Sequence, residues 1–273
     1  MMIQPAPVGA PRFAMTMDEH TELAGKFARA FGNDAFAPVE PRDLMLYVID
    51  NHDKGWKALD AAPRTDPGTG LPYNLVDTPI EDIVKSSAAS PDFNERHHAF
   101  CGLLSSMHSW GLYNGRYGMS DKLLIDAVFP AARPLVDRML AAELARQSRL
   151  KAQLASQPAT AGWIEDGKLF QNYKQLQFFD TLALYFNRTH EAARGETAFE
   201  HVPMNAREDA TIRLRPIGAA TYVLSPYPFN QDCVKVQFSG CYIEATMDGT
   251  EENWQAVFAE APTEWQSLTL TAG

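Results

Sequence analysis

LMLYVIDNHDKGW (residues 44–56) is an apolar segment that ends in a polar His-Asp pair, and it decides the fold that we expect. Its apolar residues recur at the spacing of a helix and form one buried face: Met45, Val48 and Ile49. His52 and Trp56 continue that face, and Asp53 lies one step round the helix from it. The segment therefore predicts a core helix that carries an imidazole and a carboxylate at its end.

Helix signals bound this segment and recur through the first two thirds of the chain. Pro41 suits a first helical turn, and we expect Gly55 to end the helix. Thr16 and Glu19 have the spacing of a capping box, and Gly32 follows the apolar stripe that they introduce. The further helices predicted from periodicity span residues 94–112, 121–129, 132–155 and 168–186.

The buried stripes of three other predicted helices also carry ionisable side chains, namely His20, His108 and Asp180. Any one of them alone is commonly a satisfied core residue. Together with His52 and Asp53 they are five such groups on four helices, and burying them without partners costs several kcal/mol. Convergence on a cation satisfies all five, and this mixture of imidazole and carboxylate suits Fe, Mn, Zn, Ni or Co. We therefore predict a site for one or two divalent transition-metal ions.

The C-terminal quarter has a different pattern, with short runs in which apolar and polar residues alternate. Predicted strands cover residues 210–216, 220–224, 233–238, 241–245 and 267–270. Ser239-Gly240 suits a tight turn between two of them. The chain is thus expected to be mainly α, with a Pro-rich arm at 1–15, a helical metal-binding domain at 16–192 and a small β-rich extension at 198–273.

The composition excludes several classes of protein. The chain has 273 residues, and its 45% hydrophobic content is enough for a packed core. A formal charge of −10 argues against a nucleic-acid partner and against an anionic membrane surface, because both require a basic footprint. No apolar run has the length of a membrane span, and no signal peptide is evident. Three cysteines without paired spacing fit a reducing compartment, so we expect a cytoplasmic location.

The order of the five groups resembles that of the HD-domain superfamily, in which His, His-Asp, further His and Asp lie on separate helices. The resemblance implies a helical bundle around a metal site. The local sequences are also similar to a bacterial family of unknown function, DUF3891, across roughly residues 14–190, with a weaker echo in LSPYPF (224–229). The segments that carry this similarity are DEHTELAGKFARAFGN (18–33), HDKGW (52–56), LLSSMHSWGLY (103–113) and NYKQLQFFDTLALYF (172–186).

The sequence departs from the HD pattern in two places. Many HD phosphohydrolases carry Lys after His-Asp-x-Gly, where this chain has Trp56, an apolar wall in place of a phosphate-binding cation. The candidate substitutes are Lys54, Arg96, Arg116 and Lys174. A dinuclear HD site also needs a fourth His, for which His97 or His98 are the candidates, so the site is either mononuclear or dinuclear. We expect Trp56, His98 and Lys174 to contact the substrate.

Three functions fit this site. The first is a metal-dependent hydrolase of a small molecule, with a phosphoester as one candidate substrate, in which Asp53 and His108 are the catalytic residues. The second is an HD-type di-iron oxygenase, and the third is a non-enzymatic, metal-stabilised binding module. The Pro- and Gly-rich loop 60–74 follows the His-Asp helix, and we expect it to cover the site. The sequence gives no indication of the oligomeric state.

Overall fold

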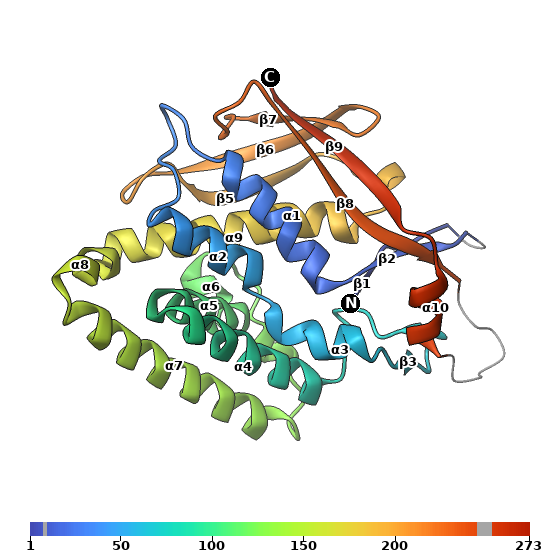
Figure 1. Ribbon diagram of the computed structural model, residues 1–273, viewed down its shortest axis with the longest axis horizontal. Coiled ribbons are helices and arrows are strands. Elements are labelled where there is room, and N and C mark those ends of the chain that lie inside the picture. Colours follow the sequence, from blue (N-terminus) through green and yellow to red (C-terminus); the bar gives the residue numbers. More distant parts are fainter. Residues whose placement is uncertain (8–9, 245–252) are drawn as a thin grey trace.

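A seven-stranded mixed sheet curls over one side of a layered arrangement of helices (Figure 1). The computed structural model describes residues 1–7, 10–244 and 253–273. About 52% of the chain is helical and 21% is strand, and the sheet forms a half-barrel. The expectation of a mainly α bundle with a small β-rich extension is therefore wrong, because the sheet is a full layer of an α/β fold. The division of the chain into an arm and two domains stays a prediction.

The helices lie mostly before residue 190. They are α1 (Met17–Ala30), α2 (Arg42–Asn51), α3 (Lys57–Ala61), α4 (Ile80–His97), α5 (Ala99–Tyr113), α6 (Gly115–Gly118), α7 (Arg133–Ala155), α8 (Pro158–Ala161), α9 (Asp166–Arg188) and α10 (Trp254–Glu260). Short 3₁₀ turns lie at Lys54–Trp56, Leu124–Ala127, Gly162–Ile164 and Glu191–Ala193.

The strands come from both ends of the chain. They are β1 (Met2–Ile3), β2 (Arg12–Met15), β3 (Thr65–Asp66), β4 (Leu71–Pro72), β5 (Thr197–Pro203), β6 (Asp209–Gly218), β7 (Thr221–Ser225), β8 (Cys233–Ile243) and β9 (Glu264–Ala272). The large sheet has the order β1-β2-β8-β9-β7-β6-β5, and β3 pairs with β4 separately. The β7–β9 pair is parallel, and the other pairs of the large sheet are antiparallel.

Two strands of the sheet come from the segment that the sequence suggested to be a loose arm. β2 pairs with β8, so that Phe13 lies opposite Tyr242 and Ala14 opposite Cys241. β1 then adds to the edge of β2. These strands are two and four residues long, too short to show an alternating pattern, and the prolines between them indicate a loop.

β8 runs without a turn through Ser239-Gly240, so the hairpin predicted there is wrong. A Cβ atom on Gly240 would lie 2.4 Å from the carbonyl oxygen of Ala14 and 2.7 Å from the Phe13 ring. The glycine therefore permits the close approach of β2, a known reason for a glycine inside a strand. Ala245, the last residue of the predicted second strand, lies outside the described residues.

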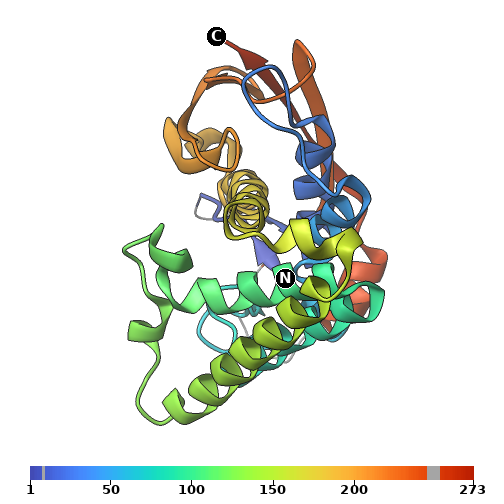
Figure 2. The same cartoon turned by 90° about the vertical axis from the view of Figure 1, so that its left-hand side faces the viewer.

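α9 lies between the curled sheet and the layer formed by α4, α5 and α7, and it is seen nearly end-on in Figure 2. α1 packs against both α9 and β8. The Thr16 hydroxyl accepts a hydrogen bond from the Glu19 amide, as the capping box predicts. The Glu19 carboxylate accepts one from the Ser239 amide of β8, which ties the start of α1 to the sheet.

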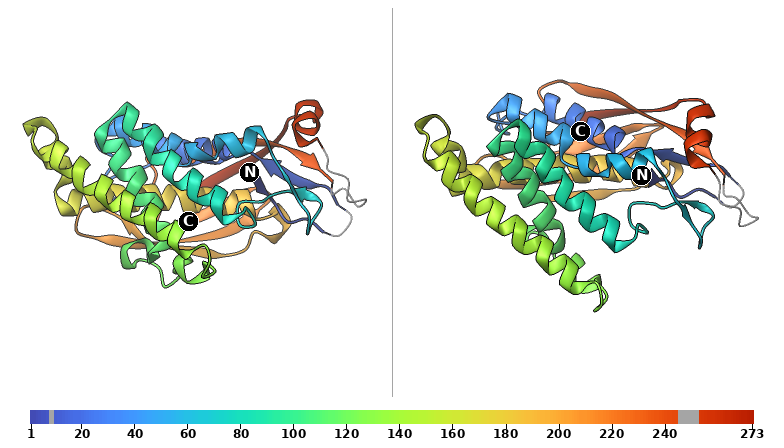
Figure 3. Two further views of the ribbon diagram at one scale, coloured as in Figure 1. Left: turned by 90° about the horizontal axis from the view of Figure 1, so that it is seen from below. Right: turned by 60° about the horizontal axis from the view of Figure 1, so that its bottom comes forward.

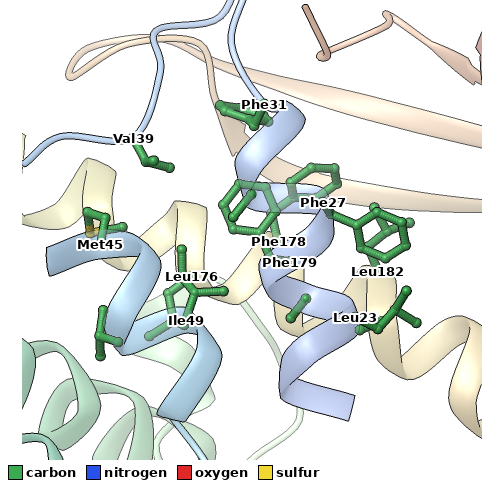
Figure 4. Close-up of a cluster of buried hydrophobic side chains, with 14 of the residues drawn as sticks. Leu23, Phe27, Phe31, Val39, Met45, Ile49, Leu176, Phe178, Phe179 and Leu182 are labelled. Atoms are coloured by element: carbon green, nitrogen blue, oxygen red, sulfur yellow. The ribbon is translucent and has the colours of Figure 1, made fainter. Parts of the chain in front are cut away.

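The main apolar core fills the space between α1, α2 and α9 (Figure 4). The Phe31 ring lies 5.2 Å from Phe179, 6.0 Å from Phe178 and 5.8 Å from Phe36. Ile49 of α2 belongs to the same core. This packing fixes the three helices that carry His20, His52 and Asp180.

The helix predictions are partly confirmed. α7 and α9 match the predicted 132–155 and 168–186, and α1 matches the first helix. α2 ends at Asn51, four residues before the predicted end at Gly55. Gly55 instead lies close to α4, because a Cβ atom on it would be 2.1 Å from the Ser86 carbonyl oxygen. The predicted helix at 94–112 is two helices, which meet at His98. Only the short 3₁₀ turn at Leu124–Ala127 forms within the predicted helix 121–129.

α4, α5 and α7 form the layer farthest from the sheet, and they lie side by side in the two views of Figure 3. Their contacts form a second, smaller core that includes Val84, Tyr113, Val136 and Met139. Among the described residues, no helix combines the length and the apolar character that a membrane crossing requires.

Replacing Gly240 by Ala is expected to destabilise the fold by about 1–3 kcal/mol, because the added methyl group meets the β2 backbone. Gly218→Ala is the matched control, since a Cβ atom on that strand glycine meets nothing within 4 Å. Urea unfolding of both variants measures the difference. Equal free energies of unfolding for the two variants would show that β2 does not pack on β8.

Candidate metal centre

Five ionisable side chains from four helical segments meet at the centre of the molecule. His20 lies on α1, His52 is the residue that caps the C-terminus of α2, and Asp53 follows it. His108 lies on α5 and Asp180 on α9. The three histidines and Asp180 are at most 2% exposed. The structure thus brings together all five residues that the sequence suggested as metal ligands.

The ligand atoms form two overlapping groups that share His52. The first group is His20, His52 and Asp180, and the second is His52, Asp53 and His108; within each, the ligand atoms lie within 4.8 Å of one another. Asp180 Oδ1 lies 3.2 Å from His20 Nε2 and 3.8 Å from His52 Nε2. Metal–ligand bonds of about 2.1 Å place neighbouring ligand atoms about 3.0–3.5 Å apart, so the spacing needs little adjustment to hold an ion.

Each imidazole is held through its Nδ1 atom, which leaves Nε2 directed at the carboxylates. His20 Nδ1 lies 3.0 Å from Asn187 Oδ1, and His52 Nδ1 lies 2.8 Å from the Ile49 carbonyl oxygen. Partners that accept from Nδ1, as at His20 and His52, fix the tautomer and the ring orientation of histidines that bind metals. His108 differs, because Gln177 Nε2 donates to its Nδ1 atom at 2.8 Å, so that the neutral ring carries its proton on Nε2, which faces Asp53.

The turn after α2 is fixed by two neighbouring helices. Asn94 of α4 donates a hydrogen bond to the Asn51 carbonyl oxygen, and Ser105 of α5 donates one to the His52 carbonyl oxygen. The last carbonyl groups of a helix have no partner within it, so these side chains satisfy two of them. The bonds also hold His52 and Asp53 in place at the end of α2.

Two buried atoms of the cluster have no hydrogen-bond partner in the part of the chain that the structure describes. They are His52 Nε2 and Asp180 Oδ2. His52 Nδ1 donates to the Ile49 carbonyl oxygen, so in the neutral ring Nε2 carries a lone pair that faces two carboxylates. A buried lone pair beside two anions is unfavourable unless a proton or a metal cation lies between them. The donor set therefore fits a metal ion, and these buried His and Asp groups could hold one.

The electrostatics of the cluster agree with cation binding. Burial raises the pKa of Asp180, but the His20 and His52 imidazoles outweigh burial and hold it well below its usual range. Burial lowers the pKa of His52, yet the charges of Asp53 and Asp180 raise it to about 9. Burial lowers the pKa of His108 to about 4. At neutral pH, Asp180 is therefore ionised, His108 is neutral and His52 is protonated, so a metal ion that binds His52 must displace the proton of its Nε2 atom.

A cavity of about 870 Å³ opens from one side of the cluster. Asp53, His108 and Asp180 line it, whereas His20 and His52 lie behind them in the core. α9 and β5 form one part of the wall, and α5 with the turn that follows it forms another. Four basic side chains also line the cavity, namely Arg116, Lys122, Lys174 and Arg188.

A family model described as "Protein of unknown function (DUF3891)" matches residues 11–245. The chain belongs to the DUF3891 family. It matches no curated protein and no solved structure. The similarity that the sequence segments indicated is thus confirmed, and the match extends beyond the helices to include β2 and most of the large sheet.

Of the three residues expected to contact substrate in this DUF3891 chain, two line the cavity and one does not. Trp56 and Lys174 line the cavity, although Lys174 is paired with Asp209. His98 does not line it; its Nδ1 atom accepts a hydrogen bond from the Phe100 amide and caps α5. His97, the other candidate for a fourth histidine, stacks on the Tyr47 ring at 3.5 Å.

The loop 60–74 does not line the cavity of this DUF3891 chain, contrary to expectation. It forms the β3–β4 hairpin, and Thr65 accepts a hydrogen bond from the Trp254 indole of α10. Leu75 and Val76, which follow the loop, do line the cavity. The loop is therefore held by α10, and the wall near the site begins one residue after it.

Sequence reasoning missed Gln177 and Asn187, the residues that hold His108 and His20. Both lie on α9 with Asp180, one turn before it and two turns after it. The sequence does contain a pattern that could have indicated them, because both amides lie at helical spacing from Asp180 and so share its face of an otherwise apolar helix. A buried amide has many satisfied roles, however, and only the fold shows that these two contact imidazoles.

Metal addition to chelator-treated protein is expected to raise the melting temperature. At a metal concentration 100 times Kd the stabilisation is about 2.7 kcal/mol, or about 5–10 °C for a chain of this size. Asp180→Asn is expected to remove this rise, whereas Asp137→Asn, a change on the exposed face of α7, retains it. Calorimetry with Mn²⁺, Zn²⁺ and anaerobic Fe²⁺ measures the shift. No shift with any metal would contradict the site.

Asn187→Ala is expected to weaken metal binding about 10–100-fold, because it frees the His20 ring while leaving every ligand in place. Asn230→Ala, at an exposed position, is the matched control. Competition with a chromogenic chelator gives the affinities. Equal affinity in the two variants would mean that His20 does not depend on Asn187 for its orientation.

Proposed function

We propose that this DUF3891 chain is a metal-dependent hydrolase of the HD-domain type that acts on a small anionic molecule. The observation that carries the proposal is the asymmetry of the cluster. Three of its five ionisable groups border a cavity, and two lie in the closed core. Structural metal sites are closed by protein ligands, whereas catalytic sites keep a position open to substrate or water. The open side favours an enzyme over a metal-stabilised binding module.

The charges of the cavity indicate the substrate class. The whole chain has a formal charge of −10, yet four basic side chains line this one cavity. Its carboxylates are Asp53 and Asp180 of the cluster and Glu200 of β5. Basic groups gathered in a cleft attract anions and raise their local concentration. A small molecule with a phosphoryl or similar group is the substrate that fits this lining.

The chain's own residues have separable roles in such a reaction. His20, His52, Asp53 and Asp180 would hold the ion, and a bound divalent ion would supply a water molecule of lowered pKa. Asp53 is more exposed than the other ligands and faces both His52 Nε2 at 3.7 Å and His108 Nε2 at 3.8 Å. Asp53 is thus placed to orient a water molecule and to accept its proton. His108 serves as a further ligand or as the acid that protonates the leaving group.

The HD-type assignment is supported by the order and origin of the ligands. His, His-Asp, His and Asp follow one another on α1, α2, α5 and α9, as the resemblance implies. Trp56, at the position of the usual Lys, lines the cavity as an apolar wall. Any cation that contacts the substrate must therefore come from another element of this chain.

A di-iron oxygenase of the same architecture is the second candidate. The number of ligand residues favours it, because His52 Nε2 would bind one ion and the remaining His and Asp side chains would be left for a second. Three imidazoles and two carboxylates suit iron as well as manganese or zinc. The nature and number of the bound ions separate the two functions.

Metal analysis and a substrate screen test the proposal together. Protein purified without chelator or His tag is expected to hold Mn, Zn, Ni or Co and to hydrolyse at least one member of a phosphoester panel. Asp53→Asn is expected to lower kcat by a factor of 100 or more, as for loss of a general base. The control is Asp50→Asn, three residues before Asp53, which changes an exposed ion pair with Arg29 and is expected to retain activity.

Two bound irons per chain together with oxygen uptake would contradict the hydrolase proposal and favour the oxygenase. Bound metal with neither activity, and loss of thermal stability alone in Asp53→Asn, would favour the binding module. Hydrolysis that survives unchanged in Asp53→Asn would show that the cluster is not the catalytic site.

A further inference from the structure

The segment labelled α6 (Gly115–Gly118), which follows α5, is a turn whose four residues all have left-handed backbone angles. The φ values are +60° at Gly115, +51° at Arg116, +58° at Tyr117 and +88° at Gly118. Glycine adopts such angles freely, but Arg and Tyr rarely do. Non-glycine residues with these angles persist only where their surroundings impose them, and they are common at ligand sites. Contacts of neighbouring residues must therefore hold this turn in place.

Tyr117 holds the turn from the core side. Its hydroxyl group donates a hydrogen bond to Gln147 Oε1 at 3.0 Å. Its ring lies 4.7 Å from the Trp110 ring and 5.1 Å from the Tyr173 ring. The Ser120 amide closes the turn by donating to the Gly115 carbonyl oxygen. These contacts fix the backbone from which the Arg116 side chain extends.

Arg116 reaches the open side of the ligand cluster. Its guanidinium lines the cavity, with Nη2 3.8 Å from Asp180 Oδ2, and its side chain is 26% exposed. That long contact is its single ion pair with the described residues. A guanidinium has five N–H donors arranged as a fork, so most of them remain available beside the metal ligands.

The other cations proposed to replace the missing HD lysine are engaged or distant. Lys54 forms an ion pair with Asp18 at 2.8 Å and does not line the cavity. Lys174 lines the cavity but pairs with Asp209. Arg96 lies over the Phe93 ring, outside the cavity. Of the four candidates, Arg116 combines available donors with contact to a residue of the cluster.

We propose that Arg116 is the substrate-binding residue that takes the phosphoryl group of a phosphate ester next to the ligand cluster. The inference rests on the proposed function and names the substrate class of that site. A guanidinium fork matches two phosphoryl oxygens at once, which a lysine ammonium does not. The turn places Arg116 at the cavity, and Trp56 forms an apolar wall of the same cavity.

Inorganic phosphate is the probe for the test, titrated calorimetrically into the metal-loaded protein at constant ionic strength. Arg116→Gln is expected to weaken phosphate binding at least about tenfold, the size of effect expected for a charge-assisted pair. Arg133→Gln removes the same charge from the exposed face of α7 and is expected to bind phosphate like the parent. Arg116→Lys, which keeps the charge but not the fork, is expected to fall between the two.

Metal content and melting temperature are measured on all variants, so that a failure to fold is recognised and Arg116→Lys then carries the comparison. Equal phosphate affinity in Arg116→Gln and Arg133→Gln overturns the proposal. Loss of bound metal in Arg116→Gln also overturns it, because Arg116 would then be a positioning residue for Asp180.

The experiments distinguish failure of the hydrolase proposal from failure of the proposed role of Arg116. Weakened phosphate binding in Arg116→Gln, without turnover of any phosphoester, supports the binding role and removes the hydrolase. Turnover with a KM that is unchanged in Arg116→Gln keeps the hydrolase and overturns the role of Arg116.

Discussion

The buried carboxylate of Asp180 is the group on which the rest of the structure depends. An ionised carboxylate in a core is costly unless it is paired and hydrogen-bonded. Here His20 lies 3.2 Å from Asp180 Oδ1, and His52 lies 3.8 Å from the same oxygen. The three residues come from α1, α2 and α9, so satisfying one charge fixes the relative position of three helices. The phenylalanine and aliphatic packing around them makes that position rigid.

The sheet contributes to the site through the helices that it supports. α1 is anchored to β8 by the contact between Glu19 and the Ser239 amide, and α9 packs against β5. β5 also forms part of the cavity wall, with Glu200 and His201 among its lining residues. A helical bundle alone would leave this side of α9 open. The half-barrel therefore closes the core behind the ligands and at the same time shapes the space in front of them.

The candidate site was more predictable from the sequence than the fold was. A buried His or Asp on a helix is conspicuous, because burial of charge is costly and the period of 3.6 residues shows which face is buried. The same argument fails for β1 and β2, which are too short for a period and are separated by prolines. It fails again at Gly240, since a glycine that suits a turn also suits the close approach of two strands. Gln177 and Asn187 were missed because an amide has no single preferred partner, and the partner here is defined by the fold.

In the proposed hydrolase, the residues that would hold an ion are separate from those that would receive a substrate. His20 and His52 are enclosed, and each is oriented by a hydrogen bond that its Nδ1 atom donates. Asp53, His108 and Asp180 face the cavity. Arg116 approaches from that open side, on a backbone turn that Tyr117 pins to the core. A purely structural ion would need neither a basic cavity nor a strained turn that directs a guanidinium at the ligands. The cost of that turn is understandable if the free donors of Arg116 meet an anion bound beside the ion.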